Sequence, residues 1–205
     1  MGLFNRNKKK QEIREDTTLD ESVVSDPLIK ALFGGEGVDR DTVMNIPAIS
    51  ACVNMIADTV STLKIKLYRK NKDRIEEVTD DHRTFLLNED TGDTLDAVQF
   101  KKAMVTDMFL GRGGYAYVNR VRGEVISINY VEEQKIGFHK NCDPVFKDYK
   151  LEVGGRTYNP WQFITLLRNT RNGCYGRSIV EESQELLDII YSSQQYEKML
   201  VKKGG

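Results

Sequence analysis

The chain has 205 residues, and its 30 basic and 31 acidic side chains leave a formal net charge of −1. The length suits one globular domain with an extension, and the 40% apolar and 30% charged residues are the mixture of a soluble protein with a polar surface. Proteins that hold nucleic acid tightly usually carry a clear basic excess, because their affinity comes largely from neutralised phosphates. The charge balance therefore argues against tight DNA binding.

The cysteines and the apolar segments exclude other classes of protein. Cys52, Cys142 and Cys174 are odd in number and far apart, which is no disulfide framework and fits a reducing cytosol. No apolar run approaches the roughly 20 residues that span a bilayer, and residues 1–6 lack the apolar stretch of a signal peptide. We expect no membrane association.

Residues 1–26 contain too few apolar groups to offset the entropy of ordering them, which predicts a flexible polar arm. The three lysines at positions 8–10 could form a basic patch for DNA or capsid, but a solvated tail is the simpler interpretation. Residues 27–33 indicate a short helix that ends at the glycines of 34–35.

The clearest predicted helix covers residues 46–62. Asn45 is a suitable N-cap, and Pro47 fits the first turn, where its missing N–H has no partner to lose. Apolar side chains then recur at intervals of three and four and predict one buried face: Ile49, Cys52, Val53, Ile56, Ala57 and Val60. Such a helix is unstable alone, so we expect a buried scaffold covered by a sheet or by other helices.

Strand-like and helix-like segments alternate after this helix. Leu63, Ile65 and Leu67 alternate with lysines, which is the period of a half-buried strand. The other expected elements are a turn at 71–73, a strand at 74–78, helices at 81–88 and 95–110 with Thr94 capping the second, a hairpin of 115–118 and 125–130 around Arg122 and Gly123, and strands near 134–139, 146–153 and 163–168 with a turn at Gly154 and Gly155.

The end of the chain predicts one long helix. Residues 178–181, Ser-Ile-Val-Glu, form a capping box, and the helix should run to about Val201. Together the segments predict an α+β fold, in which helices pack on antiparallel strands and hairpins and the chain ends in a long helix. We expect three regions: the arm 1–26, an α+β domain 27–177, and the helix 178–205 leading toward further chain.

Residue clusters that could carry chemistry have simpler structural interpretations. The glycines of 111–114 follow a helix and precede a strand, the wrong order for a dinucleotide site, and predict a turn with positive φ. Residues 34–37 lack the Lys-Ser/Thr of a P-loop. His139 and Cys142 stand alone, whereas a structural zinc needs four ligands in paired spacings.

The remaining candidates are acidic or aromatic. Asp80 with Asp81 and Glu132 with Glu133 lie in polar stretches beside turns, which indicates solvated surface. Trp161 is predicted to anchor the core at the start of the next strand, with an aromatic ledge for a partner as the alternative. No nucleophile has an orienting group and an oxyanion site beside it. The sequence thus predicts no catalytic residue, no cofactor-binding residue, no cofactor and no metal ligand.

The segment IPAISACVNMIADTV at residues 46–60 resembles the opening helix of the HK97-type phage portal family. The start MGLF followed by basic residues is also similar to many members. Five later segments agree with the family in order and spacing: 63–69, similar to its L-x-L-K-L-Y strand, 82–87, 113–120 (GGYAYVNR), 163–168, and 173–178 (GCYGRS), similar to G-x-x-G-x-S-P.

The resemblance covers about residues 43–200 and has departures. Arg83 and Ile179 replace prolines of the family, and the strand at 163–168 lacks the family's histidine. Members usually run to about twice this length, with an F-x-N-G-A-x-P segment after the last helix. The resemblance therefore implies the N-terminal, wing-like portion of a portal, with much of the stem, channel lining and crown absent.

The resemblance also implies a function. Portal subunits are non-enzymatic and form a ring, a dodecamer in this family, at one capsid vertex for viral DNA packaging, DNA ejection and head–tail connection. The implied partners are further copies of the chain, the major capsid protein, the terminase large subunit, the head–tail adaptor, and double-stranded DNA that passes non-specifically. The implied location is the virion, after assembly in the host cytoplasm, and the gene could belong to a prophage.

Two other classes remain open at this point. A small cytosolic α+β enzyme of hydrolase type would need a site that the sequence does not display. A regulatory nucleic-acid-binding module is disfavoured by the net charge. Binding of nucleotides or metals in a thermal-shift screen would favour the enzyme.

Overall fold

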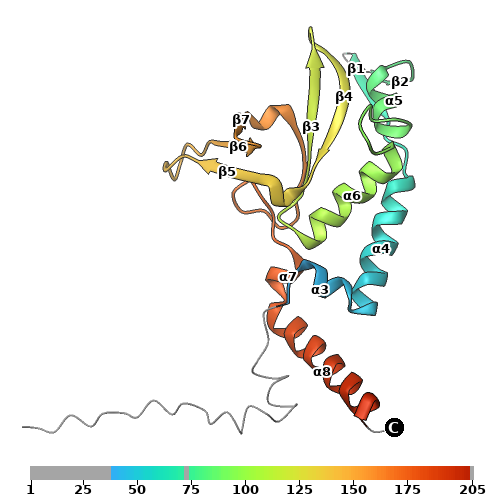
Figure 1. Cartoon of the computed structure of the whole chain (residues 1–205). Helices are drawn as coiled ribbons and strands as arrows, with labels where there is room; N and C mark the ends of the chain where they lie inside the picture. The colour runs from blue at the N-terminus through green and yellow to red at the C-terminus, as the bar shows by residue number, and fades with distance from the viewer. Residues whose placement is uncertain (1–37, 72–73, 204–205) are drawn as a thin grey trace, which may run out of the picture. The chain divides into compact units, whose positions relative to one another are not determined.

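The computed structural model describes residues 38–71 and 74–203 (Figure 1). The expected arm 1–26, short helix 27–33 and glycine linker 34–37 lie outside the described residues.

One compact unit of the chain ends at Tyr191, and residues 192–203 belong to a second unit, so each is described by itself. All described elements lie in the first unit except the later part of the last helix. The helices before the sheets are α3 (Arg40–Met44), α4 (Pro47–Thr62), α5 (His82–Asn88) and α6 (Ala97–Leu110).

Aspartate side chains begin three of these helices. Asp39, Asp81 and Asp96 accept hydrogen bonds from backbone N–H groups in the first turns of α3, α5 and α6, and Gln99 completes a capping box with Asp96. The prediction that Thr94 caps α6 is therefore wrong, because the aspartate two positions later provides the reciprocal pair of bonds.

Helix α4 begins without a side-chain cap. Asn45, predicted as its cap, instead ends α3, where its N–H donates to the carbonyl of Thr42 and the N–H of Ile46 donates to that of Val43. Ile46 holds the cap position of α4 and Pro47 opens the helix. Proline lacks one of the N–H groups that a cap would otherwise satisfy.

The strands form three antiparallel sheets in the described part of the chain, in the orders β1–β2, β4–β3–β8 and β5–β6–β7. Arg122 and Gly123, both with positive φ, join β3 to β4 and confirm the predicted hairpin. Strand β7 was not predicted. The strands are β1 (Leu67–Asn71), β2 (Arg74–Val78), β3 (Gly114–Val121), β4 (Glu124–Val131), β5 (Ile136–Lys140), β6 (Tyr149–Val153), β7 (Arg156–Tyr158) and β8 (Phe163–Leu166), with 3₁₀ helices at Glu133–Lys135 and Pro160–Gln162.

Residues 63–66 form no strand, contrary to the prediction. The N–H and C=O of Ile65 bond to the side-chain amide of Asn88, each at 2.8 Å. The carbonyl of Leu63 accepts a hydrogen bond from Lys101 Nζ at 2.8 Å. Side chains thus occupy backbone groups that a neighbouring strand would have used.

The core of the first unit has α6 at its centre. One side of α6 packs on α4 and another on β3 of the sheet β4–β3–β8 (Figure 1). Gly114 permits this approach, since a Cβ there would collide with the backbone of Met104. The buried residues between α5, α6 and this sheet are Leu86, Phe100, Met104, Ala116 and Ile128, and those between the two three-stranded sheets are Tyr115, Ile136, Leu151 and Phe163.

Helix α4 buries a narrower stripe than predicted. Val53 and Ala57 are buried, whereas Cys52 is exposed and Ile56 and Val60 remain 37% and 36% exposed. The prediction that Cys52, Ile56 and Val60 are buried with the rest of this face is wrong, because α6 covers only one side of α4.

The C-terminal helix is interrupted once. Helix α7 (Ile179–Glu182) ends at Ser183, whose φ of −126° and ψ of 24° are not helical, and α8 (Gln184–Lys203) follows. The prediction of one continuous helix is wrong in this detail. The α+β fold ending in a long helix is confirmed.

Candidate functional site

The segment that joins β8 to α7, which we call the 168–178 loop, connects the sheets to the last helices of the first unit. Its two ends are bonded together, with the N–H of Arg177 donating to the carbonyl of Arg168 at 2.9 Å. Asn169 has a φ of 47° where the chain turns. Gly176 passes so near the backbone of Arg168 that any Cβ would collide with it.

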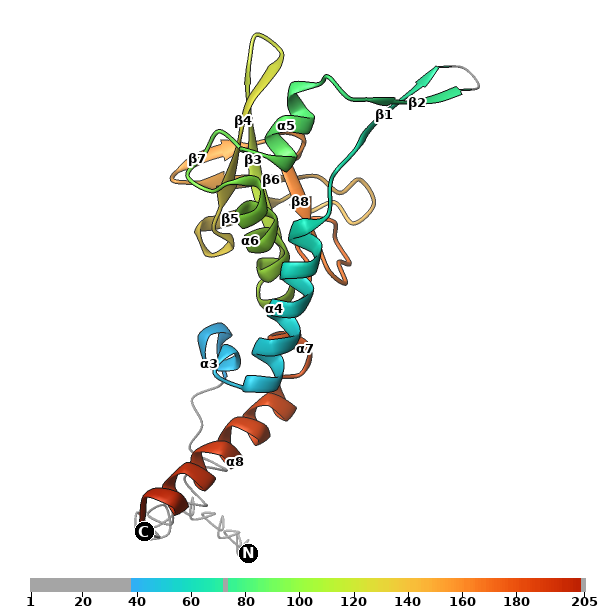
Figure 2. The same ribbon diagram turned by 90° about the vertical axis from the view of Figure 1, so that its right-hand side faces the viewer.

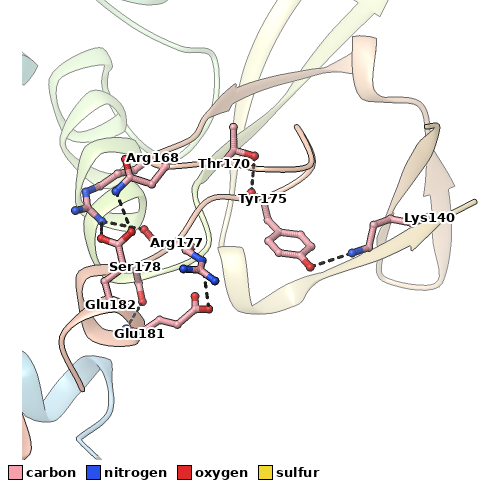
Figure 3. A network of polar contacts seen from close by, with 9 residues as sticks. Lys140, Arg168, Thr170, Tyr175, Arg177, Ser178, Glu181 and Glu182 are labelled. Atoms are coloured by element: carbon pink, nitrogen blue, oxygen red, sulfur yellow. Dashed lines mark hydrogen bonds and ion pairs between the residues drawn. The ribbon is translucent and has the colours of Figure 1, made fainter. Parts of the chain in front are cut away.

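Polar side chains organise the interior of the loop (Figure 3). The Oδ1 of Asn172 accepts hydrogen bonds from the N–H groups of Cys174 and Tyr175 at 2.9 and 3.1 Å. Thr170 Oγ1 donates to the carbonyl of Tyr175 at 2.7 Å. The loop therefore has one defined shape, set by its own residues.

Two bonds attach the loop to the strand β3 and the turn before it. The N–H of Gly176 donates to the carbonyl of Arg112 at 2.6 Å, and the buried hydroxyl of Tyr115 donates to the carbonyl of Cys174 at 2.9 Å. Burial raises the pKa of both the Tyr115 hydroxyl and the Cys174 thiol. Burial therefore disfavours the thiolate of Cys174, which is the nucleophilic form of a cysteine.

Tyr175 attaches the loop to strand β5. Lys140 Nζ donates to the Tyr175 hydroxyl at 2.9 Å and lies 4.6 Å from the centre of its ring (Figure 3). The ring of Phe138 packs against the same tyrosine at a centroid distance of 5.5 Å. This cation–π and ring contact joins the sheet β5–β6–β7 to the loop.

The loop also determines where α7 begins (Figure 3). Ser178 Oγ accepts from the N–H of Glu181 at 2.9 Å, which confirms the predicted cap. Arg168 forms an ion pair with Glu182 at 2.6 Å, and Asn169 Nδ2 donates to the same carboxylate at 2.9 Å. The Asn169 amide and then the Arg168 guanidinium hold the pKa of Glu182 below its ordinary value.

The reciprocal half of the predicted capping box is absent. The Glu181 side chain lies 4.0 Å from Arg177 rather than on the N–H of Ser178 (Figure 3). A second anchor holds the start of α8, where Asp188 Oδ1 accepts from the N–H of Val38 at 2.9 Å. The arrangement can orient a helix relative to two sheets.

Other predicted candidates lie apart from the loop interior. His139 bonds through Nε2 to Glu152 on the neighbouring strand, and Cys142 is exposed. Within residues 38–71 and 74–203 no group of three side chains is placed to hold a metal ion. Asp81, predicted as plain surface, caps α5 and pairs with Arg83 at 2.7 Å.

The predicted burial of two residues, Glu133 and Trp161, is wrong. Glu133, predicted to be solvated, is 6% exposed and is paired with Arg112, because the turn before β5 folds it inward. Trp161, predicted to anchor the core, is 64% exposed and lies beside Arg120 at 5.7 Å. The residue belongs to a 3₁₀ helix with a capping box at Asn159, and none of the residues of that helix is buried.

Sequence reasoning treated the loop as a simple connection. The signal that could have identified it is the pair of glycines that directly follow Asn172 and Tyr175, since asparagine and glycine at such short intervals are typical of a chain that turns back on itself. The contact of Lys140 with Tyr175 had no signal, because 35 residues separate the two.

A comparison with known families decides the class of protein. The family described as phage portal protein matches residues 47–205, from the start of α4 to the end of the chain. The chain belongs to the phage portal protein family. No curated protein sequence matches it.

Solved portal structures share the fold. An HK97 family phage portal protein from Corynebacterium diphtheriae is 12% identical with a TM-score of 0.54, over 82% of this chain and 52% of that one. The neck of a native GTA particle computed with C12 symmetry is 15% identical with a TM-score of 0.53, over 87% and 45%. The virion of a native gene transfer agent particle is 15% identical with a TM-score of 0.55, over 86% and 50%. This portal chain thus spans about half the length of the chains it matches.

Portal proteins are structural components of the phage particle, and the candidate site agrees with that class. The 168–178 loop contains the segment GCYGRS that resembled the portal motif. Its glycine, serine cap and ion pair hold a helix in place. Among the described residues no helix has the length and apolar content to cross a membrane.

Proposed function

We propose that this chain supplies the wing-like portion of a portal subunit, which assembles into a ring at one capsid vertex for DNA packaging, DNA ejection and head–tail connection. The observation that carries the proposal is the family match over residues 47–205. The C12 symmetry of one structural neighbour supports a ring of twelve subunits. We further propose that residues 1–26, 27–177 and 178–205 act as arm, wing and connecting helix.

The proposed partners are other copies of the subunit, the major capsid protein, the terminase large subunit and the head–tail adaptor. Double-stranded DNA would pass without specific contacts. The net charge of −1 supports this, because each firm phosphate contact would have to be broken whenever the DNA slides. The proposed location is the capsid vertex of the virion, after assembly in the host cytoplasm.

Exposed apolar side chains support contacts beyond this chain. Met55 and Leu63 on and beside α4 are 64% and 59% exposed, and Leu186 and Ile189 on α8 are 59% and 53% exposed. A helix that is apolar over much of its circumference normally packs on more than one side. We propose that a neighbouring subunit or the rest of the portal covers these residues.

The test of the function is inactivation of the gene in the phage or prophage that encodes it. We expect heads that lack packaged DNA, with rescue when the intact gene is supplied in trans. DNA-filled, infectious particles from the inactivated phage would overturn the proposal.

The contact through the last helix can be tested by hydrogen exchange on this chain and on the assembled ring. We expect residues 191–201 to exchange more slowly in the ring. Equal protection in both samples would show that the helix makes no contact outside the chain.

We also infer that the chain performs no catalytic turnover and needs no cofactor or metal. The burial of Cys174, which raises the pKa of its thiol, and the pairing of His139 with Glu152 support this inference. ATP hydrolysis by the purified protein that one point substitution abolishes would contradict it.

A further inference from the structure

The hairpin of β1 and β2 has two free edges. Among the described residues these strands pair only with each other, whereas the other sheets have three strands each. Tyr68 and Ile75 on the hairpin are 55% and 70% exposed. Figure 2 shows the far end of the hairpin standing away from α5 and α6 of the same unit. An isolated two-stranded hairpin is marginally stable, and each free edge offers a row of unpaired N–H and C=O groups.

The two strands carry opposite charge. Residues 64–71, which include β1, contain four basic residues and no acidic residue: Lys64, Lys66, Arg69 and Lys70. Residues 74–81, which include β2, contain four acidic residues and one basic residue: Glu76, Glu77, Asp80, Asp81 and Arg74. One edge of the hairpin is therefore positive and the other negative.

Contacts within the chain leave much of this charge unpaired. Lys66 pairs with Glu77 at 3.0 Å across the hairpin. In the described part of the chain, Lys70 and Glu76 form no ion pair, and neither do Lys64 and Asp80 just outside the strands. The register explains this for Lys70, which lies opposite Ile75.

We propose that the β1–β2 hairpin joins subunits, with the basic β1 edge of one copy pairing with the acidic β2 edge of the next. The occupant is a second copy of this chain, because one hairpin carries both of the complementary edges. Backbone hydrogen bonds would supply affinity and the charges would select the partner edge. Each copy has one edge of each kind, so the contact is head-to-tail, and such contacts close into rings or grow into open filaments.

This inference rests on the proposed portal function and names a contact within its ring. Charge reversal on either strand tests it in the full 205-residue chain. The first variant carries Lys64→Glu, Arg69→Glu and Lys70→Glu, which makes residues 64–71 net negative. The second carries Glu76→Lys and Asp80→Lys, which makes residues 74–81 net positive. Sedimentation velocity and native mass spectrometry measure self-association over a concentration series, and thermal melting confirms that each variant is folded.

We expect each variant alone to associate at least about tenfold more weakly than the wild type, because two edges of like charge would then meet. An equimolar mixture of the two variants should regain the association, since every contact between unlike copies again joins opposite charges. Damage confined to one hairpin cannot be repaired by mixing, so recovery in the mixture identifies an intermolecular contact. A chain with all five substitutions should also associate, because the signs of its two edges are exchanged.

Three outcomes would overturn the inference: a wild-type chain that stays monomeric throughout the series, variants that associate as the wild type does, or a mixture that regains nothing. These failures are distinct from failure of the portal function. Closed rings that ignore the hairpin charges would leave the portal function standing. Association through the hairpin into open filaments alone would keep the hairpin contact and count against the ring.

Discussion

Helices α4 and α6 pack side by side and have similar lengths, yet they are buried to different extents. Helix α6 buries seven of its 14 residues, including Lys101 and Asp107, whereas α4 buries three of 16. The regular apolar repeat nevertheless belongs to α4. Helix α6 has α4 on one side and the sheet β4–β3–β8 on another, while among the described residues no sheet packs on α4 to a similar extent. The number of covering layers, rather than the regularity of the pattern, determined burial.

The buried polar residues of α6 find their hydrogen-bond and ion-pair partners on other parts of the chain. Lys101 donates to the carbonyl of Leu63, and burial lowers the pKa of its ammonium group. Asp107 is paired with Arg40 and accepts a hydrogen bond from the Tyr130 hydroxyl at 2.6 Å. Each buried polar group has a partner from another element, which is what makes its burial tolerable.

The largest expected effect is a loss of stability when a charge is placed on the buried face of α4 rather than on its exposed face. Val53 is 3% exposed, so Val53→Asp would bury an unpaired charge and should lower the free energy of unfolding by about 3–5 kcal/mol. Urea unfolding followed by circular dichroism measures the loss.

The control on the same helix is Ile56→Asp. Ile56 is 37% exposed, so this variant should lose no more than about 1 kcal/mol in the free chain. Equal losses for the two variants would show that both faces are covered and that the comparison of the helices is wrong.

The next effect concerns the buried carboxylate of α6. Asp107→Ala leaves the Tyr130 hydroxyl without an acceptor and Arg40 without a counter-ion, which should cost about 2–3 kcal/mol in unfolding free energy. The control is Asp58→Ala on α4, whose ion pair with Lys102 is half exposed and should contribute at most about 1 kcal/mol. If the control cost as much as Asp107→Ala, burial would not be the cause.

Alkaline pH should lower the free energy of unfolding through the two buried tyrosines, Tyr115 and Tyr130. Burial raises the pKa of Tyr115 and of Tyr130, the latter also through its bond to Asp107. Above about pH 10 the two tyrosines lose their protons in the unfolded state but keep them in the folded state. The free energy of unfolding that they contribute is therefore fully present below about pH 10. Above that pH it falls by up to about 1.4 kcal/mol per pH unit for each tyrosine. Tyr130→Phe should make the decline shallower in urea titrations at pH 9–11, and Tyr68→Phe on the exposed hairpin should leave it unchanged.

The smallest expected effect lies at the start of α7. Asn169 and Arg168 lower the pKa of Glu182 in the folded state, so its contribution is present above the ordinary value of 4.5 and is lost as pH falls through the lower folded value. Glu182→Gln should therefore reduce the acid sensitivity of the urea midpoint, with Glu185→Gln as the control. Parallel acid profiles for the Glu182→Gln variant and the wild type would show that the ion pair with Arg168 does not act in solution.

Local sequence patterns predicted the structure correctly where it depends on residues that are close together in the chain. The turn at Arg122 and Gly123, the helix start at Ser178 and the extent of α4 were predictable, because each depends on residues within a few positions. The family motifs at 46–60 and 173–178 identified the portal class for the same reason. The 168–178 loop was only partly predictable. Its glycines indicate a turn, but no local pattern indicates that it contacts Arg112 and Lys140.

The sequence by itself determined the order of most elements, the α+β class and the portal family. Only the tertiary structure decided which apolar face of α4 is covered and that Trp161 is exposed and Glu133 buried. It also decided that the backbone groups of Ile65 bond to the side chain of Asn88 instead of to a neighbouring strand. The physical reason is that a periodic pattern specifies which side chains are able to be buried together. Whether they are buried depends on distant segments that supply the covering layer and the hydrogen-bond partners.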